Sequence, residues 1–164
     1  MKHHSSVILW LAVFTAIVVS VPVRADVFSD SDSLLPPLQE WTGKSEQLMV
    51  AADNPWVTPA ERTGLRATPA YDETVSWLQN LVAAAHELQM VSIGKCLQGR
   101  DLWMVIACAD QVFDAADIHA TGKPLLIAHA GIHSGEIDGK DAGLMLLRDM
   151  TVAGKRKELL ANAN

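Results

Sequence analysis

The sequence has few cysteines, few aromatic residues and fewer basic than acidic side chains. Two cysteines in 164 residues are too few for a disulfide framework to define the fold. Thirteen Lys and Arg residues against nineteen Asp and Glu give a formal net charge of −6. This balance argues against nucleic acid or an anionic membrane surface as a partner. The length is sufficient for one domain with a hydrophobic core.

Long hydrophobic runs are also scarce, and the longest uncharged one occupies residues 7–21. It is short for a bilayer span, which needs roughly 17–25 residues, although a retained membrane anchor is the alternative. Val23 and Ala25 suit cleavage before Asp26, so residues 1–25 are predicted to be a signal peptide. Cleavage would remove Lys2 and Arg24 and move the net charge from −6 to −8. We therefore expect an exported protein, periplasmic or secreted, without a membrane partner after cleavage.

The rest of the chain divides by composition and hydrophobic period. Residues 26–70 are rich in Pro, Ser and Asp, which predicts a leader segment with short helical turns, held to the domain by Trp41 and Trp56. Periodicity then predicts helices at 71–88, 137–150 and 155–163, strands at 89–95, 100–109 and 124–130, and a loop at 109–123. The run "PLLIAHA" at 124–130 is typical of a strand covered on both faces. This order predicts a layered α/β domain with a mixed sheet.

Cys96 and Cys108 both fall in strand-like segments. In an oxidising compartment they could pair, and two buried thiols are at least as compatible with the pattern. They lack metal-ligand spacing, and we assign them no role.

One short stretch combines residues suited to metal chemistry. His133 and Glu136 come directly after the apolar run and at the start of a predicted helix. Ligand sites gather at the carboxyl ends of strands in α/β sheets. In a first helical turn, side chains three residues apart face the same way, so an imidazole and a carboxylate can bind one ion. We predict that His133 and Glu136 share a metal ion.

The neighbouring polar residues are not expected to bind the metal ion. His129 would lie about 13 Å from His133 along an extended strand, so we expect a buried or sheet-end histidine. Asp138 and Asp141 are expected to stabilise the start of the helix. His119, in the predicted loop, and His3 and His4, in the leader peptide, are expected to have no special function.

Two stretches together resemble a known family. "SIGKCLQGRDLWMVIA", a loop, and then "KPLLIAHAGIHSGEIDGKDAGLMLLRDM" resemble the amino-terminal part of the zinc carboxypeptidases, the pancreatic carboxypeptidase-like metallopeptidases, over roughly residues 70–152. They look closest to the exported bacterial branch. The resemblance implies a layered α/β/α domain with a mixed sheet, zinc as cofactor, a peptide or protein substrate, and His133 and Glu136 as the first two zinc ligands. Residues 71–164 would then be a truncated amino-terminal part of the catalytic domain.

The sequence departs from the family in two ways. Gly135 stands where digestive members have a substrate-holding Arg, which leaves carboxypeptidase specificity open. The family's third ligand, its substrate-binding Arg and its catalytic Glu correspond to positions beyond Asn164, so we expect no general base in these residues and an inactive chain on its own. Arg100 matches the family's turn arginine and is read as structural. The alternatives are a zinc-dependent acyl-amide hydrolase and a non-catalytic, degenerate exported module.

Overall fold

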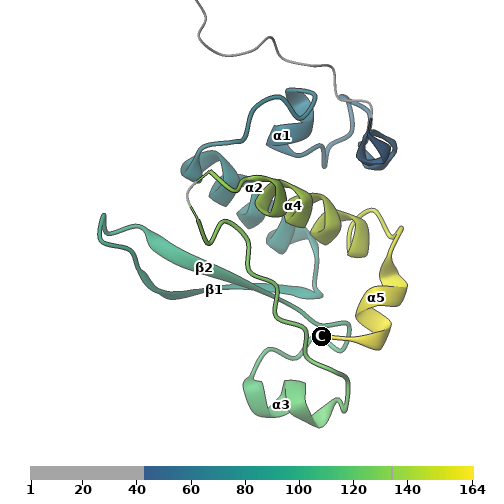
Figure 1. Cartoon of the computed structure of the whole chain (residues 1–164). Coiled ribbons are helices and arrows are strands. Elements are labelled where there is room, and N and C mark those ends of the chain that lie inside the picture. Colours follow the sequence, from purple (N-terminus) through teal and green to yellow (C-terminus); the bar gives the residue numbers. More distant parts are fainter. Residues whose placement is uncertain (1–42, 134) are drawn as a thin grey trace, which may run out of the picture. The chain divides into compact units, whose positions relative to one another are not determined.

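The computed structural model describes residues 43–133 and 135–164 (Figure 1). The predicted signal peptide and Trp41 lie outside the described residues. Within those residues, no helix is both long enough and apolar enough to cross a membrane.

Residues 43–70 contain two short helical turns, η2 (Lys44–Leu48) and α1 (Pro59–Arg62). A capping box starts α1: the N–H of Glu61 donates to Thr58 Oγ1, and the N–H of Thr58 donates to Glu61 Oε2. These reciprocal bonds satisfy backbone donors that a helix start leaves free. Val57 is buried, and its carbonyl accepts a bond of 3.1 Å from Trp77 Nε1. The segment therefore packs on the helix that follows it.

The predicted helix at 71–88 is present as α2 (Tyr71–Ala84). Its buried residues recur at three- and four-residue steps, as an amphipathic helix requires, and Trp77, Leu78 and Leu81 form the centre of the core. The helix ends earlier than predicted because Ala85 is extended, with φ −118° and ψ 107°.

The predicted hairpin is confirmed. β1 (Leu88–Lys95) and β2 (Asp101–Ala107) pair antiparallel, with Met90 opposite Val105. Gly99 in the turn has φ +78°, a conformation that glycine adopts without steric cost. Met90, Val105 and Ala107 pack against the core. The opposite face of the hairpin carries exposed side chains such as Ile93 and Met104.

The remaining helices are α3 (Ala115–Ala120), α4 (Asp138–Met150) and α5 (Lys157–Asn162). The last two confirm the predicted helices, whereas α3 lies in the predicted loop. It begins where the Asp114 carboxylate accepts a bond from the N–H of Ala116. Leu144 of α4 joins the core cluster of α2, and both helices cover the same face of the hairpin (Figure 1).

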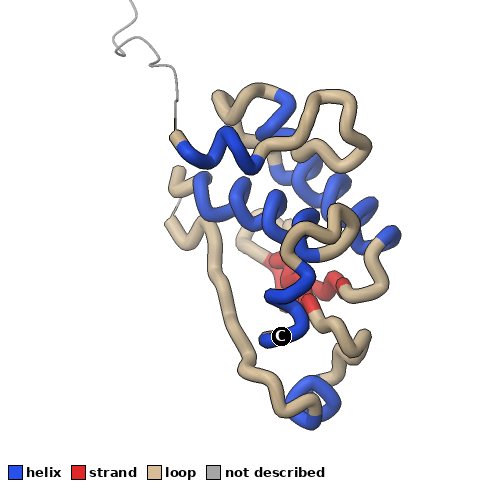
Figure 2. The backbone as a smooth tube through the Cα atoms, turned by 90° about the vertical axis from the view of Figure 1, so that its right-hand side faces the viewer, coloured by secondary structure: helices blue, strands red, loops and turns tan. Residues whose placement is uncertain are grey.

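The predicted third strand at 124–130 is wrong. Among the described residues, the backbone of this segment makes only two hydrogen bonds, from Leu126 N–H to the Asn164 carbonyl and from Asn164 N–H to the Pro124 carbonyl. Figure 2 shows the segment as a loop apart from the two strands. Leu125, Leu126 and Ile127 are 63%, 76% and 72% exposed, so burial on both faces is also wrong. An apolar run forms a strand only beside another strand that satisfies its backbone groups. The α/β class is confirmed, and the described sheet is a two-stranded antiparallel pair.

A buried ion network joins α1 to α4. Arg148 is fully buried, and its guanidinium donates to Glu61 Oε2 at 2.6 Å, to Asp149 Oδ1 at 2.8 Å and to the Leu48 carbonyl at 3.2 Å. Burial alone would raise the pKa of Glu61, but hydrogen bonds from Arg148, from Thr58 and from the N–H of Val50 outweigh burial and hold this pKa below its ordinary value of 4.5. Glu61 therefore stays ionised and paired at neutral pH.

Candidate metal-binding site

His133 and Glu136 lie in the turn between the exposed segment 124–131 and α4. The turn is held by a bond from the N–H of Glu136 to the His133 carbonyl, 3.2 Å, and by one from the N–H of Ile137 to the Gly135 carbonyl, 3.0 Å. Gly135 has φ +92°, in the region that side-chain-bearing residues rarely adopt. The positive φ explains physically why glycine suits this position of the turn.

The two predicted ligands point at each other. His133 Nδ1 lies 3.0 Å from Glu136 Oε1 and 3.0 Å from Oε2. Their side chains are 76% and 66% exposed, so solvent reaches both groups. The imidazole and the carboxylate therefore meet at the surface, at the amino-terminal end of α4.

This separation can be compared with that of two ligands on one zinc ion. Two donors at about 2.05 Å from a tetrahedral zinc are about 3.3 Å apart. The observed 3.0 Å differs from that by a few tenths of an ångström, which small side-chain rotations of exposed groups can supply. The residue types also fit, because zinc takes imidazole nitrogen and carboxylate oxygen. His133 and Glu136 thus fit as two ligands of one site.

The described residues do not complete such a site. Within residues 43–133 and 135–164, no group of three or more His, Cys, Asp or Glu side chains is placed to hold a metal ion. A catalytic zinc site has three protein ligands and an open position for water. Within the described residues, this pair alone therefore does not make a complete zinc site.

The other polar residues singled out in the sequence lie elsewhere. His129 is exposed, so the expectation of a buried or sheet-end histidine is wrong, for the same reason that the third strand is absent. Asp138 and Asp141 lie in the first turn of α4, and Asp141 binds Lys140 Nζ at 2.7 Å. His119 is exposed on α3.

Arg100 and the cysteines have structural surroundings. The guanidinium of Arg100 lies over the ring of Tyr71, 5.4 Å from its centroid, a cation–π contact that fixes the hairpin turn on α2. Cys96 and Cys108 are both free thiols, and Cys108 is buried. The structure has separate thiols in place of a disulfide, but only Cys108 is buried, and Cys96 is half-buried.

Two features were not predicted from the sequence. One is the buried network of Arg148, whose partner Glu61 lies 87 positions away in the sequence. The other is an apolar cavity of about 700 Å³ between β2 and the segment 124–128. Its only sequence signal is the apolar run at 124–130 itself, whose composition predicts a buried strand.

These features define an α/β domain with a paired imidazole and carboxylate at the start of a helix, an arrangement suited to a zinc hydrolase. The family model described as zinc carboxypeptidase matches residues 74–163, more than half of the chain. The chain therefore belongs to the zinc carboxypeptidase family. No curated protein and no solved structure matches it.

Proposed function

We propose that this chain is the amino-terminal part of an exported zinc metallopeptidase in which His133 and Glu136 are two of the three zinc ligands. The observation that supports the proposal is the 3.0 Å approach of His133 Nδ1 to both carboxylate oxygens of Glu136. Family membership over residues 74–163 supports hydrolysis of peptide bonds as the reaction class. The third ligand and the general base would come from polypeptide outside residues 1–164.

The residues of this chain would have a binding and orienting role. His133 Nδ1 and both carboxylate oxygens of Glu136 face one another across 3.0 Å, so the two side chains present their donor atoms to the same position. Exposure of both side chains leaves room for a third ligand and a substrate. A zinc ion held there would polarise the scissile carbonyl and lower the pKa of its bound water. The substrate would be a peptide or protein in the periplasm or outside the cell.

Zinc binding to the purified chain tests the ligand pair. Four-ligand structural sites bind zinc with about 10–16 kcal/mol. Half of the ligands would contribute about 5–8 kcal/mol, or a dissociation constant of roughly 1 µM to 0.2 mM. Isothermal titration calorimetry should show this weak binding in the parent chain and none in His133→Ala or Glu136→Gln. The matched control is His119→Ala, which removes an exposed histidine away from the pair.

Two results would contradict the proposal. Zinc binding that persists unchanged in His133→Ala would place the metal elsewhere. Tight stoichiometric binding with hydrolysis by residues 1–164 alone would mean that the chain already holds a full ligand set.

The substrate class needs a longer gene product, if the reading frame continues past codon 164. Release of single C-terminal residues from peptides supports a carboxypeptidase. Activity confined to small N-acyl amino acids would instead identify an acyl-amide hydrolase. A stop codon directly after codon 164 would favour a non-catalytic module.

A further inference from the structure

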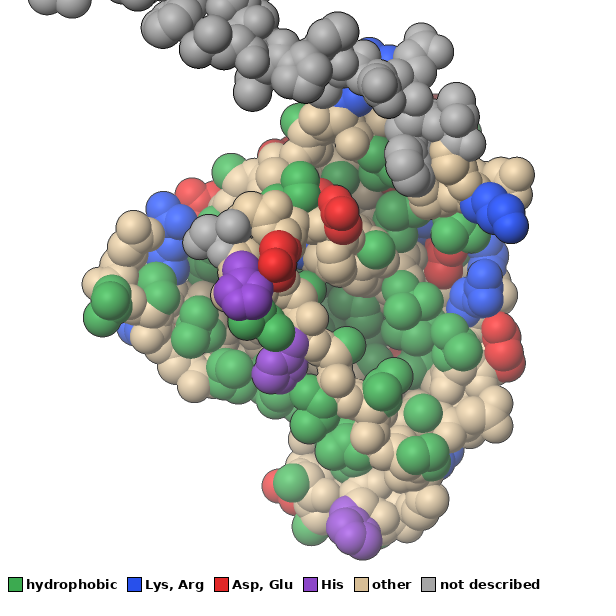
Figure 3. All heavy atoms as spheres, in the orientation of Figure 1, with side chains coloured by type: hydrophobic (Ala, Val, Ile, Leu, Met, Phe, Trp, Pro, Cys, Tyr) green, Lys and Arg blue, Asp and Glu red, His purple; other side chains and the backbone are tan. Residues whose placement is uncertain are grey.

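His133 and Glu136 belong to the ligand turn (residue 133 and residues 135–137), which lies between the segment 124–130 and α4. In Figure 3, a histidine and an acidic side chain lie side by side on the surface. The side chains of His133 and Glu136 are both mostly exposed, so contacts of the pair itself do little to fix its place on the domain. Anchorage of the ligand turn therefore depends on the polypeptide on either side of it.

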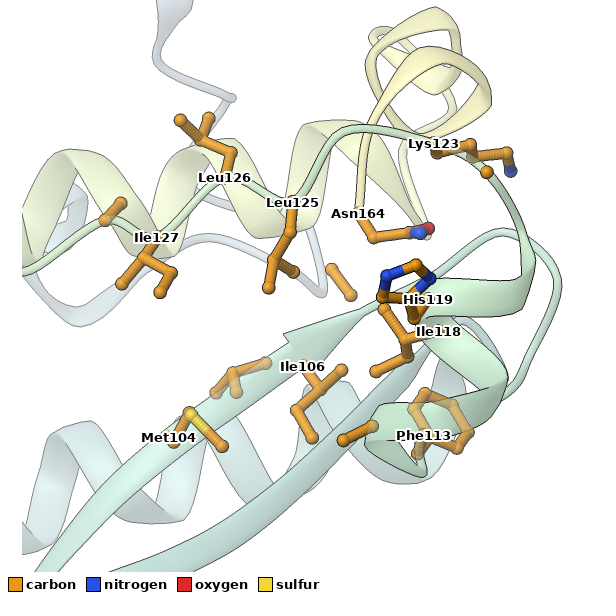
Figure 4. A pocket seen from close by; sticks show the side chains of 15 residues that line it. Met104, Ile106, Phe113, Ile118, His119, Lys123, Leu125, Leu126, Ile127 and Asn164 are labelled. Carbon is orange, nitrogen blue, oxygen red and sulfur yellow. The ribbon is translucent and has the colours of Figure 1, made fainter.

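The segment before the ligand turn gives little anchorage. Leu125 and Ile127 are both mostly exposed, and Figure 4 shows these two side chains at the border of the cavity beside β2. Within residues 43–133 and 135–164, the backbone of 124–130 forms hydrogen bonds only with Asn164. The ligand turn is therefore held mainly from its other side, where α4 begins.

Backbone hydrogen bonds make the ligand turn continuous with α4. The N–H of Ile137 donates to the Gly135 carbonyl at 3.0 Å, and the N–H of Asp141 donates to the Ile137 carbonyl at 3.1 Å. The second of these bonds has the i→i−4 spacing of an α-helix. Ile137 occupies the N-cap position and provides no side-chain hydrogen bond, and helix ends fray. Order in the ligand turn therefore depends on another contact that holds the first turn of α4.

Lys140 provides such a contact. Its ammonium donates to Asp141 Oδ1 at 2.7 Å and to the Pro69 carbonyl at 3.5 Å. The second distance is long for a hydrogen bond, but the charge of the ammonium strengthens its attraction to the carbonyl oxygen. Because Pro69 lies two residues before α2, this side chain links the starts of α4 and α2. The side chains of Lys140 and Asp141 are 29% and 13% exposed, so water screens their contact less than that of a surface pair.

We propose that Lys140 is a positioning residue for the metal-ligand pair. By tying the first turn of α4 to the start of α2, it keeps the ligand turn in the conformation that brings His133 and Glu136 together. This inference rests on the proposed function, because the pair needs positioning only if it binds zinc. Lys140 is only four residues from Glu136, so its positive charge repels a cation held by the pair. A lysine at this position therefore favours metal binding only through the order that it imposes.

Substitution of Lys140 separates positioning from charge, because the two effects on zinc affinity have opposite signs. Lys140→Met removes the ammonium and keeps an unbranched side chain. Removal of the positive charge alone would tighten zinc binding. Loss of the tether would add the cost of ordering the ligand turn, and the cost of ordering one side chain weakens affinity about threefold to tenfold. We expect isothermal titration calorimetry of the full chain with zinc to show a dissociation constant about threefold to tenfold higher in Lys140→Met.

Two variants are matched controls. Lys140→Arg keeps the charge and the donors, and it should restore most of the zinc affinity. Lys155→Met makes the same change of charge at an exposed lysine between α4 and α5, and it should leave the zinc affinity unchanged. Hydrogen exchange without zinc gives a second measurement: the amides of Ile137 and Asp141 should exchange about threefold faster or more in Lys140→Met, and at the parent rate in Lys155→Met. Urea denaturation confirms that each variant is folded under the conditions of both measurements.

Several results would overturn the positioning role. One is zinc binding that is tighter or unchanged in Lys140→Met, and another is an equal loss of affinity in Lys155→Met or in Lys140→Arg. Parent exchange rates at Ile137 and Asp141 in Lys140→Met would show that the tether does not order the ligand turn. Absence of zinc binding in the parent chain would refute the proposed function instead, and faster exchange in Lys140→Met would even then support the tether itself.

Discussion

Replacing Arg148 with methionine should be among the most destabilising single changes in this chain. Methionine keeps much of the side-chain length and removes the guanidinium. That group is fully buried and donates to Glu61, Asp149 and the carbonyl of Leu48. Without it, two carboxylates and one carbonyl lose a donor in the protein interior. The N–H groups of Thr58 and Val50 still bond to Glu61, so part of its charge remains compensated.

The expected loss can be bounded. Removing one partner of a buried ion pair costs about 3–5 kcal/mol, because the remaining charge is left unpaired. Total stabilities of domains are about 5–15 kcal/mol, so Arg148→Met should remove about a fifth of the stability or more. Urea denaturation followed by tryptophan fluorescence measures this loss as a lower midpoint. Glu61→Gln keeps a polar side chain in place and should cost less, about 1–3 kcal/mol.

A surface pair gives the control. Lys95 and Asp101 form an ion pair at 3.0 Å on the exposed hairpin, and Lys95→Met should leave the urea midpoint unchanged. If Arg148→Met costs less than about 1 kcal/mol, the network does not join α1 to α4 energetically, and the reasoning from burial is refuted.

Three further results are expected. The pKa of Glu61 is lowered in the folded state. Its contribution to stability is therefore present above the ordinary glutamate pKa and is lost as the pH falls through the lowered value. When the pH is taken below 4.5, the urea midpoint should decrease, and it should decrease less steeply in Glu61→Gln. Leu81→Ala opens a cavity at a fully buried site and should cost about 2–5 kcal/mol in urea denaturation, whereas Leu97→Ala, at a fully exposed site, should cost nothing measurable. Tyr71→Phe removes a hydroxyl that donates to the Asp101 carbonyl and accepts from Trp103 Nε1. The free energy of unfolding should fall by about 1–3 kcal/mol, which is measured as a lower thermal midpoint. An unchanged midpoint would mean that water replaces the hydroxyl.

Local patterns predicted the local elements well. The apolar steps of α2 and the change to β-rich runs on either side of Gly99 each identified the right element, because both depend on neighbours close in sequence. The spacing of His133 and Glu136 likewise predicted that the two side chains would meet, and the turn around Gly135 brings them together. Their role as zinc ligands stays a prediction.

The failures share one cause. The run at 124–130 has the composition of a buried strand, but composition does not provide the strand beside it. His129 was misplaced with it. The hydrogen bond between Arg148 and Glu61 joins residues 87 positions apart in the sequence. The hydrophobic period of a segment cannot predict a contact between residues so far apart in the chain.

The sequence alone determined α2, α4, α5, the hairpin and the approach of His133 to Glu136, since each depends on residues close in sequence. The resemblance to zinc carboxypeptidases also came from the sequence, through the order of its motifs over residues 70–152. Only the tertiary structure decided that the segment 124–130 is exposed, that Arg148 is buried with three partners, and that a cavity lies beside β2. These depend on which distant segments pack together, because burial and backbone pairing are properties of neighbours in space.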